Sequence, residues 1–104
     1  ELAAKYVAGL KKLGLTDQLT FLLGIGPIAS AKSARWMDQN LFGVNVPAHI
    51  IERIESAGDA AAQKKEGIVI CRELLDVYRN MDGVGGVHIM APAASTSAIA
   101  AVLK

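Results

Sequence analysis

Two glycines at the end of an apolar run form the first pattern that could do chemistry. Residues 24–29 read Gly-Ile-Gly-Pro-Ile-Ala, which matches the G-x-G-x-x-G/A fingerprint of dinucleotide-binding proteins. Such a fold also needs a second strand, roughly 20 residues later, that ends in Asp or Glu. The corresponding segment, residues 43–47, is short and ends in Pro47, and Pro27 lacks the amide that a phosphate would use. The context therefore disfavours a nucleotide-phosphate loop.

A parallel barrel would use the same residues differently. In such a barrel, the loops that follow the strands form a catalytic rim. Gly24 and Gly26 allow close approach of a ligand or of backbone, Pro27 stiffens the turn, and Ser30 can cap the next helix. Residues 87–93 repeat this arrangement, because Val-His-Ile-Met is followed by Ala-Pro-Ala. We therefore expect two adjacent strands of one barrel.

Periodicity and turn signals predict the elements that position these two loops. Residues 19–25 are a continuous apolar run with a short polar lead, which is typical of a strand buried on both faces. Ser30 and Asp59 are expected helix caps, and Ser95 or Ser97 is expected to cap the last helix. The expected order is helix, strand, three helices, strand and helix, over residues 2–13, 19–25, 31–40, 47–56, 60–80, 87–90 and 96–103.

The alternation of strands and helices predicts a parallel sheet with right-handed crossovers. Two strands make too small a sheet to be stable alone, and a strand with two apolar faces needs neighbours on its edges. We therefore expect the 104 residues to be part of a larger structure. The missing sheet would come from more of the same polypeptide or from a partner chain.

Composition and charge narrow the function classes. Apolar residues make up 52% of the chain and the formal net charge is +1, without a large basic cluster, so nucleic acid is not an expected partner. No apolar run approaches the roughly 20 residues of a membrane span, and residues 1–18 lack a secretory pattern. The single cysteine, Cys71, cannot form an internal disulfide and lies on the apolar stripe of the long helix. We expect a cytoplasmic protein in which Cys71 is inert core.

Single polar and aromatic side chains give no catalytic pattern. His88 alternates with apolar neighbours and has no Cys, Asp or Glu at metal-ligand spacing, so we expect a structural, hydrogen-bonded histidine and no metal site. We expect Trp36 to pack between helices, and Lys32 and His49 to be solvated near helix starts, although a ligand role for Lys32 stays open. The charged residues within 52–66 are expected to form solvated helix faces. No base and nucleophile pair marks a hydrolase.

Three segments, taken together, resemble a known family. Residues 24–37, GIGPIASAKSARWM, are similar to the pattern G-I-x-P-x-x-S/N-x-K-x-A-x-x-F/M. Residues 43–75 begin Gly-Val-Asn-Val-Pro and continue with a short helix, an acidic-Gly turn and a long helix. Residues 83–93, GVGGVHIMAPA, resemble a final strand with the pattern G-V-x-G-x-H-x-M/Y-x-x-N. In this order and spacing, residues 20–104 resemble the methylenetetrahydrofolate reductases.

The resemblance implies an α/β fold that is the C-terminal third of a (β/α)8 TIM barrel. Residues 1–104 would be the C-terminal segment of a single catalytic domain, with two parallel strands and flanking helices, incomplete on its own. Residues 1–18 would hold the helix before the seventh strand, residues 19–80 the seventh strand and its helices, and residues 84–104 the eighth strand and last helix.

The resemblance also implies a reaction in one-carbon metabolism. Enzymes of this family hold FAD in the barrel mouth, take electrons from NADH, NADPH or another donor, and reduce 5,10-methylenetetrahydrofolate to 5-methyltetrahydrofolate. Their assisting Glu and most flavin contacts come from earlier parts of the barrel, so we expect no catalytic residue in this segment. The positions that face the folate would be Ser33, Met37 and Pro92, where many relatives have Gln, Phe and Leu.

Two other interpretations remain open. One is another TIM-barrel enzyme, such as a folate-linked methyltransferase component. The other is a non-catalytic α/β module that assembles with a partner subunit. In each case we expect the remainder of a barrel or a partner subunit as the binding partner, within a homo-oligomer or hetero-oligomer. Upstream sequence would discriminate, because the reductase needs an early Glu and flavin-binding residues.

Overall fold

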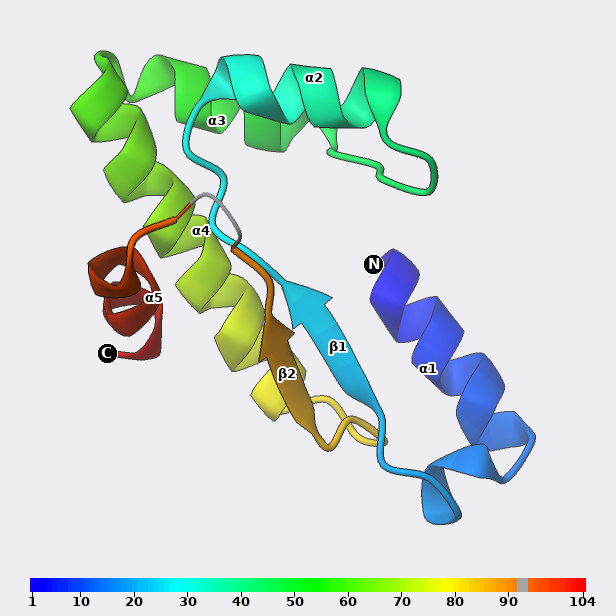
Figure 1. Cartoon of the computed structure of the whole chain (residues 1–104). Helices are drawn as coiled ribbons and strands as arrows, with labels where there is room; N and C mark the ends of the chain where they lie inside the picture. Colours follow the sequence, from blue (N-terminus) through cyan, green and yellow to red (C-terminus); the bar gives the residue numbers. More distant parts are fainter. Residues whose placement is uncertain (92–93) are drawn as a thin grey trace. The chain divides into compact units, whose positions relative to one another are not determined.

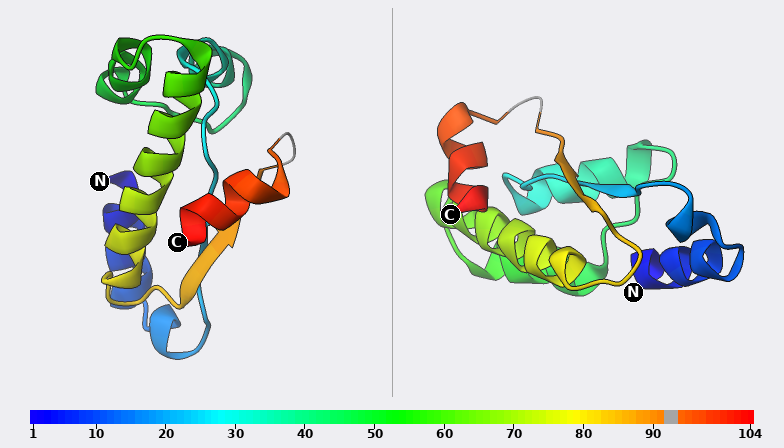
Figure 2. Two further views of the ribbon diagram at one scale, coloured as in Figure 1. Left: turned by 90° about the vertical axis from the view of Figure 1, so that its left-hand side faces the viewer. Right: turned by 90° about the horizontal axis from the view of Figure 1, so that it is seen from below.

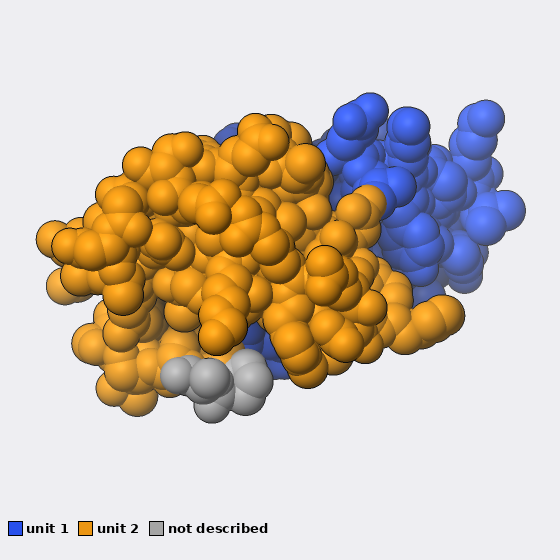
Figure 3. Space-filling model, turned by 90° about the horizontal axis from the view of Figure 1, so that it is seen from above, with its two compact units in different colours: residues 1–25, 73–90 blue, residues 26–72, 91–104 orange. Residues whose placement is uncertain are grey.

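A computed structural model describes residues 1–91 and 94–104 of the chain. The described residues form five α-helices, one short 3-10 helix and two strands (Figure 1). They divide into two units, residues 1–25 with 73–90 and residues 26–72 with 91–104 (Figure 3). The long helix α4 (Ala60–Arg79) begins in the second unit and ends in the first.

The first unit contains a pair of parallel strands. β1 (Leu22–Ile25) pairs with β2 (Gly86–Ile89), so the predicted parallel neighbours are confirmed (Figure 1). Helix α1 (Leu2–Lys12) precedes them and is followed by Gly14, whose left-handed φ of 71° ends the helix as predicted. The short helix η1 (Leu15–Asp17) then leads toward β1.

The predicted strand at residues 19–25 is shorter and more exposed than expected. Its regular part begins at Leu22, and among the described residues only one of its faces is covered, because the Leu22 side chain is 59% exposed while Ile25 is buried. Successive side chains of a strand point to opposite faces. One face of the pair therefore carries Leu22, Gly24, Gly86 and His88, and within the described residues this face is not covered.

The second unit is helical around a small apolar core. It contains α2 (Ala31–Asn40), α3 (Ala48–Ser56), the start of α4, and α5 (Thr96–Leu103). Figure 2 shows α2 and α3 side by side. Ala31, Ile54 and Ile70 are buried together, and Ile28, Ile50 and Ile51 pack against them. Helices α2, α3 and α4 thus each contribute one buried side chain to the same cluster.

The predicted helix caps are confirmed. Ser30 Oγ accepts a hydrogen bond from the Ser33 amide at 3.1 Å, and Asp59 Oδ1 accepts one from the Ala62 amide at 2.8 Å. Ser95, rather than Ser97, caps α5 by accepting from the Ala98 amide at 3.3 Å. A cap satisfies one amide that the first helical turn leaves without an intrahelical partner.

Gly67 allows α4 to touch the segment that follows β1. A Cβ atom at Gly67 would overlap the carbonyl oxygen of Ile28. Gly67 is buried in the middle of α4, next to the turn that carries the core residue Ile70. The glycine in the predicted apolar stripe of this helix therefore marks a close contact between two backbones.

Replacing Gly67 by alanine should destabilise the complete protein, whereas the same change at Gly9 should not. Overlap with a backbone carbonyl forces a shift of the packed segment, which costs on the order of 1–3 kcal/mol of unfolding free energy. Gly9 lies in α1, and a Cβ atom added there would meet no other atom within 4 Å. Gly9→Ala should therefore raise the free energy of unfolding by about 0.5–1 kcal/mol, because alanine has the higher helix propensity. Urea unfolding of both variants measures the difference, and equal stability of Gly67→Ala and the parent protein would refute the close contact.

Candidate functional site

The candidate site is the segment after β1 together with the first two turns of α2. Residues 26–30 leave the carboxyl end of β1, and Ser30 then starts the helix. Ser33 and Met37 lie one helical turn apart, on the same side of α2, and both are half-buried. Ala31 and Ala34 form the buried edge of the helix beside them. The expected shared face of Ser33 and Met37 is therefore present.

The hydroxyl of Ser33 is already used within its own helix start. It donates a hydrogen bond to the Ser30 carbonyl oxygen at 3.0 Å and accepts one from Ser30 Oγ at 3.0 Å. A hydroxyl has one proton and two lone pairs, so one lone pair stays available to a ligand. Ser33 can thus accept a hydrogen bond from a bound molecule without breaking the cap, but it cannot donate one.

The amides at the start of α2 also have partners. The Ala31 amide donates to Gln63 Oε1 at 3.0 Å, and the Ser33 amide donates to Ser30 Oγ at 3.1 Å. A phosphate group at a helix start needs such amides to be free. The occupied amides of Ala31 and Ser33 therefore disfavour a phosphate site at the start of α2, in agreement with the sequence context.

The charged side chains in and around this segment are exposed or paired. Lys32 is exposed, as expected. Arg35 forms an ion pair with Glu55 of α3, and Arg53 Nε donates to Glu66 Oε1 of α4 at 2.6 Å. These two pairs join α2 to α3 and α3 to α4. Glu55 is exposed, as predicted for the charged residues within 52–66, whereas Arg53 and Glu66 are half-buried. Within residues 26–37, no carboxylic acid or histidine could serve as a proton donor.

Two aromatic side chains lie on the outer side of the α2 region. Trp36 is 57% exposed, so the expectation that it packs between helices is wrong. It lies on the side of α2 away from Ala31 and Ala34, because successive helical residues are about 100° apart. Phe42, in the loop that Asp38 closes by accepting a hydrogen bond from the Val46 amide at 2.8 Å, is fully exposed.

The remaining candidate residues are Cys71, two histidines and Pro92, and the three described ones differ in burial. Cys71 is buried, and burial raises the pKa of its thiol, which confirms inert core. His49 is exposed near the start of α3, as predicted. His88 is also exposed, on the open face of β2 opposite Gly24, and its expected structural, hydrogen-bonded role stays a prediction. Pro92 lies outside the described residues.

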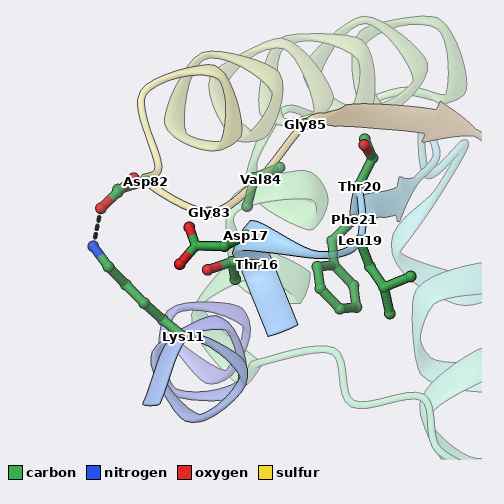
Figure 4. A pocket seen from close by; sticks show the side chains of 10 residues that line it. All are labelled: Lys11, Thr16, Asp17, Leu19, Thr20, Phe21, Asp82, Gly83, Val84 and Gly85. Carbon is green, nitrogen blue, oxygen red and sulfur yellow. Dashed lines mark hydrogen bonds and ion pairs between the residues drawn. The ribbon is translucent and has the colours of Figure 1, made fainter. Parts of the chain in front are cut away.

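A hollow of about 260 Å³ lies in the first unit, beside the residues that precede β1 and β2 (Figure 4). Residues 19–21, which precede β1, and residues 82–85, which precede β2, line it together with side chains of α1 and η1. Lys11 and Asp82 form an exposed ion pair at its edge. Their hydrogen bond and mutual attraction raise the pKa of Lys11 and lower the pKa of Asp82.

This hollow is not the expected site. Catalytic groups of parallel barrels gather at the carboxyl ends of the strands, whereas the amino ends serve stability. None of Ser33, Met37 and His88 lines the hollow. Among the described residues, no group of three or more His, Cys, Asp and Glu side chains could hold a metal ion. None of the described helices combines the length and apolarity that a bilayer crossing requires.

The most informative residue that the sequence did not reveal is Gln63. Its side chain reaches from α4 to the first turn of α2, and its partner Ala31 is 32 positions away along the chain. No local spacing rule connects two residues so far apart. Gln63 also sits among charged residues, where a solvated side chain is the ordinary expectation.

Comparison with known proteins gives one match. A family model described as "Methylenetetrahydrofolate reductase" matches residues 3–104, which is nearly the whole chain. No curated protein and no solved structure matches the chain.

Proposed function

We propose, because the chain belongs to the methylenetetrahydrofolate reductase family, that it forms part of an enzyme that reduces 5,10-methylenetetrahydrofolate to 5-methyltetrahydrofolate. The family match over residues 3–104 is the observation that carries this proposal. It favours an oxidoreductase over a folate-linked methyltransferase component and over a non-catalytic module.

The two strands would be the seventh and eighth of a (β/α)8 barrel. Their parallel pairing supports this assignment, and so does the unequal burial of the two faces. Leu22 is 59% and Met90, just after β2, is 60% exposed, whereas Ile25 on the opposite face is buried. In a barrel one face of each strand turns to the interior and packs there against side chains of other strands. The remaining strands would come from more of the same polypeptide or from a partner subunit.

The flavin would be held mainly by residues outside this segment. Two amides at the start of α2, those of Ala31 and Ser33, are already hydrogen-bonded to Gln63 and Ser30, which disfavours binding of the cofactor's phosphates there. When bound, a reduced flavin supplies the hydride for the reduction of the methylene carbon. NADH, NADPH or another electron donor would regenerate it.

The role of this segment would be to orient the folate. Met37 offers a polarizable apolar surface for a flat heterocycle, and Ser33 offers one lone pair for a ligand N–H. Both groups lie on the same side of α2, the helix that follows the carboxyl end of β1 along the chain. Pro92 is the third proposed folate-facing residue and stays a prediction from the family pattern. Protonation of the folate would fall to a group elsewhere in the enzyme.

Residues 1–104 expressed alone should be aggregated, molten or oligomeric. Each strand of the pair has an unpaired edge within the described residues, and one face of the pair exposes Leu22 and Met90. Unpaired edges and open apolar faces promote association. Size-exclusion chromatography and amide dispersion in NMR spectra test this expectation. A monomer with sharp dispersion and cooperative unfolding would contradict the proposed division of the barrel.

The complete enzyme should purify with bound yellow flavin, while residues 1–104 alone should bind flavin weakly or not at all. The physical reason is that two amides at the start of α2, those of Ala31 and Ser33, already donate to Gln63 and Ser30, and that Pro27 has no amide to offer. Absorbance near the flavin bands and equilibrium dialysis provide the measurement. Tight, stoichiometric flavin binding by residues 1–104 alone would contradict the proposal that the flavin is held mainly by residues outside this segment.

Met37→Ala in the complete enzyme should weaken folate binding and leave flavin content nearly unchanged. Loss of contacts to a planar ring should cost on the order of 1–2 kcal/mol, or roughly ten-fold in kcat/KM for the folate. Met81→Ala is a matched control, because Met81 is also half-buried but precedes β2 at the opposite end of the strands. Its KM should equal that of the parent enzyme.

An ordinary core role for Met37 predicts a different result. The alanine variant would then lose about 2–5 kcal/mol of stability, and its KM would stay unchanged per folded molecule. Melting curves and folate titrations on Met37→Ala and Met81→Ala separate the two cases. A large fall in Tm with an unaltered KM would remove Met37 from the site.

A further inference from the structure

The start of α2 is joined to α4 by one bifunctional side chain. Gln63 Oε1 accepts a hydrogen bond from the Ala31 amide at 3.0 Å, and Gln63 Nε2 donates one to the Gly58 carbonyl oxygen at 2.9 Å. An amide proton needs an acceptor and a carbonyl needs a donor, so the two partners fix which end of the Gln63 amide is oxygen. The side chain is therefore held at both ends.

The Ala31 amide is a group that α2 cannot satisfy by itself. The first four amides of an α-helix have no intrahelical acceptor. Ser30 accepts from the Ser33 amide, and Gln63 accepts from the Ala31 amide. Ala31 is 3% exposed and belongs to the core cluster, so water has little access to its amide. Without Gln63, this amide would have to find another partner by moving.

Other contacts between α2 and the rest of the unit do not replace this hydrogen bond. The Arg35–Glu55 ion pair is exposed on both sides, and exposed pairs restrain geometry weakly. The contact of Gly67 with Ile28 lies before α2, and the apolar packing of Ala31 against Ile54 and Ile70 supplies no acceptor for the Ala31 amide. Gln63 acts at the first helical residue itself, two positions before Ser33 and six before Met37.

We propose that Gln63 is a positioning residue for the folate. By holding the Ala31 amide, it sets the orientation of the first turns of α2 and thereby places Ser33 and Met37 where the substrate meets them. This inference rests on the function proposed above, because it assigns Gln63 a role in that same site. Gln63 itself touches no reacting atom.

Three variants of the complete enzyme test the proposal. Gln63→Leu removes both hydrogen bonds while keeping a side chain of similar size. Gln63→Glu keeps an acceptor for the Ala31 amide but replaces the donor to Gly58 by a carboxylate oxygen, which the Gly58 carbonyl oxygen repels. Gln39→Leu is the matched control, because Gln39 is an exposed residue of α2 that forms no side-chain hydrogen bond among the described residues.

The first measurement is amide hydrogen exchange of peptides that cover residues 28–36. Gln63→Leu should speed exchange in these peptides roughly ten-fold, because the Ala31 amide loses its acceptor. Gln63→Glu and Gln39→Leu should exchange like the parent enzyme. Unaltered exchange in Gln63→Leu would overturn the proposal, since the hydrogen bond would then not hold α2.

The second measurement separates binding from the chemical step. Gln63→Leu should lower kcat/KM for 5,10-methylenetetrahydrofolate roughly ten-fold, mainly through KM, at unchanged flavin content. Gln63→Glu should restore the parent KM, which a general loss of stability would not explain. Equal KM values for all variants, or a KM for Gln63→Glu as poor as that of Gln63→Leu, would overturn the proposal. If Gln63→Leu does not fold, Gln63→Ala, which removes the same two hydrogen bonds with less bulk, is measured in its place, and a parent-like KM in that variant would overturn the proposal.

Failure of the proposed function would look different. A parent enzyme that does not reduce the folate would refute that function, while the exchange measurement would still show whether Gln63 holds α2. An active parent enzyme with faster exchange but an unchanged KM in Gln63→Leu would refute the positioning role alone.

Discussion

The backbone of α4 and the segment after β1 approach so closely that no side chain fits between them. Gly67 lies against the carbonyl group of Ile28, where a Cβ atom would overlap the oxygen. Protein interiors are packed as densely as organic crystals, so the carbonyl has little room to move aside. Helix α2 begins three residues after Ile28. The position of α2, and with it the substrate-facing role proposed for Ser33 and Met37, depends on this approach.

The parts of the fold that depend on neighbouring residues could be predicted from the sequence. Ser30, Asp59 and Ser95 each accept a hydrogen bond from the amide three residues later, so the helix starts follow from short spacing alone. Parallel pairing followed from the alternation of strands and helices. The family pattern drew on the same local segments, and the match over residues 3–104 confirmed it.

The parts that depend on distant partners could not be predicted. Gln63 looks like any polar residue on a charged helix until Ala31, 32 residues away, is placed beside it. Arg35 and Glu55 meet across 20 residues in the same way. An apolar residue type also does not reveal what covers it. Leu22 and Trp36 were expected to be buried, and both are more than half exposed among the described residues.

Gly67 also bears on the order in which the second unit forms. Glycine inside a helix costs about 1 kcal/mol relative to alanine, and isolated helices of this length are marginal in water even with good helix formers. The 20-residue helix α4 therefore depends on packing for its stability, and the segment after β1 supplies part of that packing at Gly67. During synthesis that segment leaves the ribosome before α4, and until α4 follows it can pack only against the apolar residues of α3. Docking of α4 against this segment therefore supplies part of the stability that the glycine withholds from the helix.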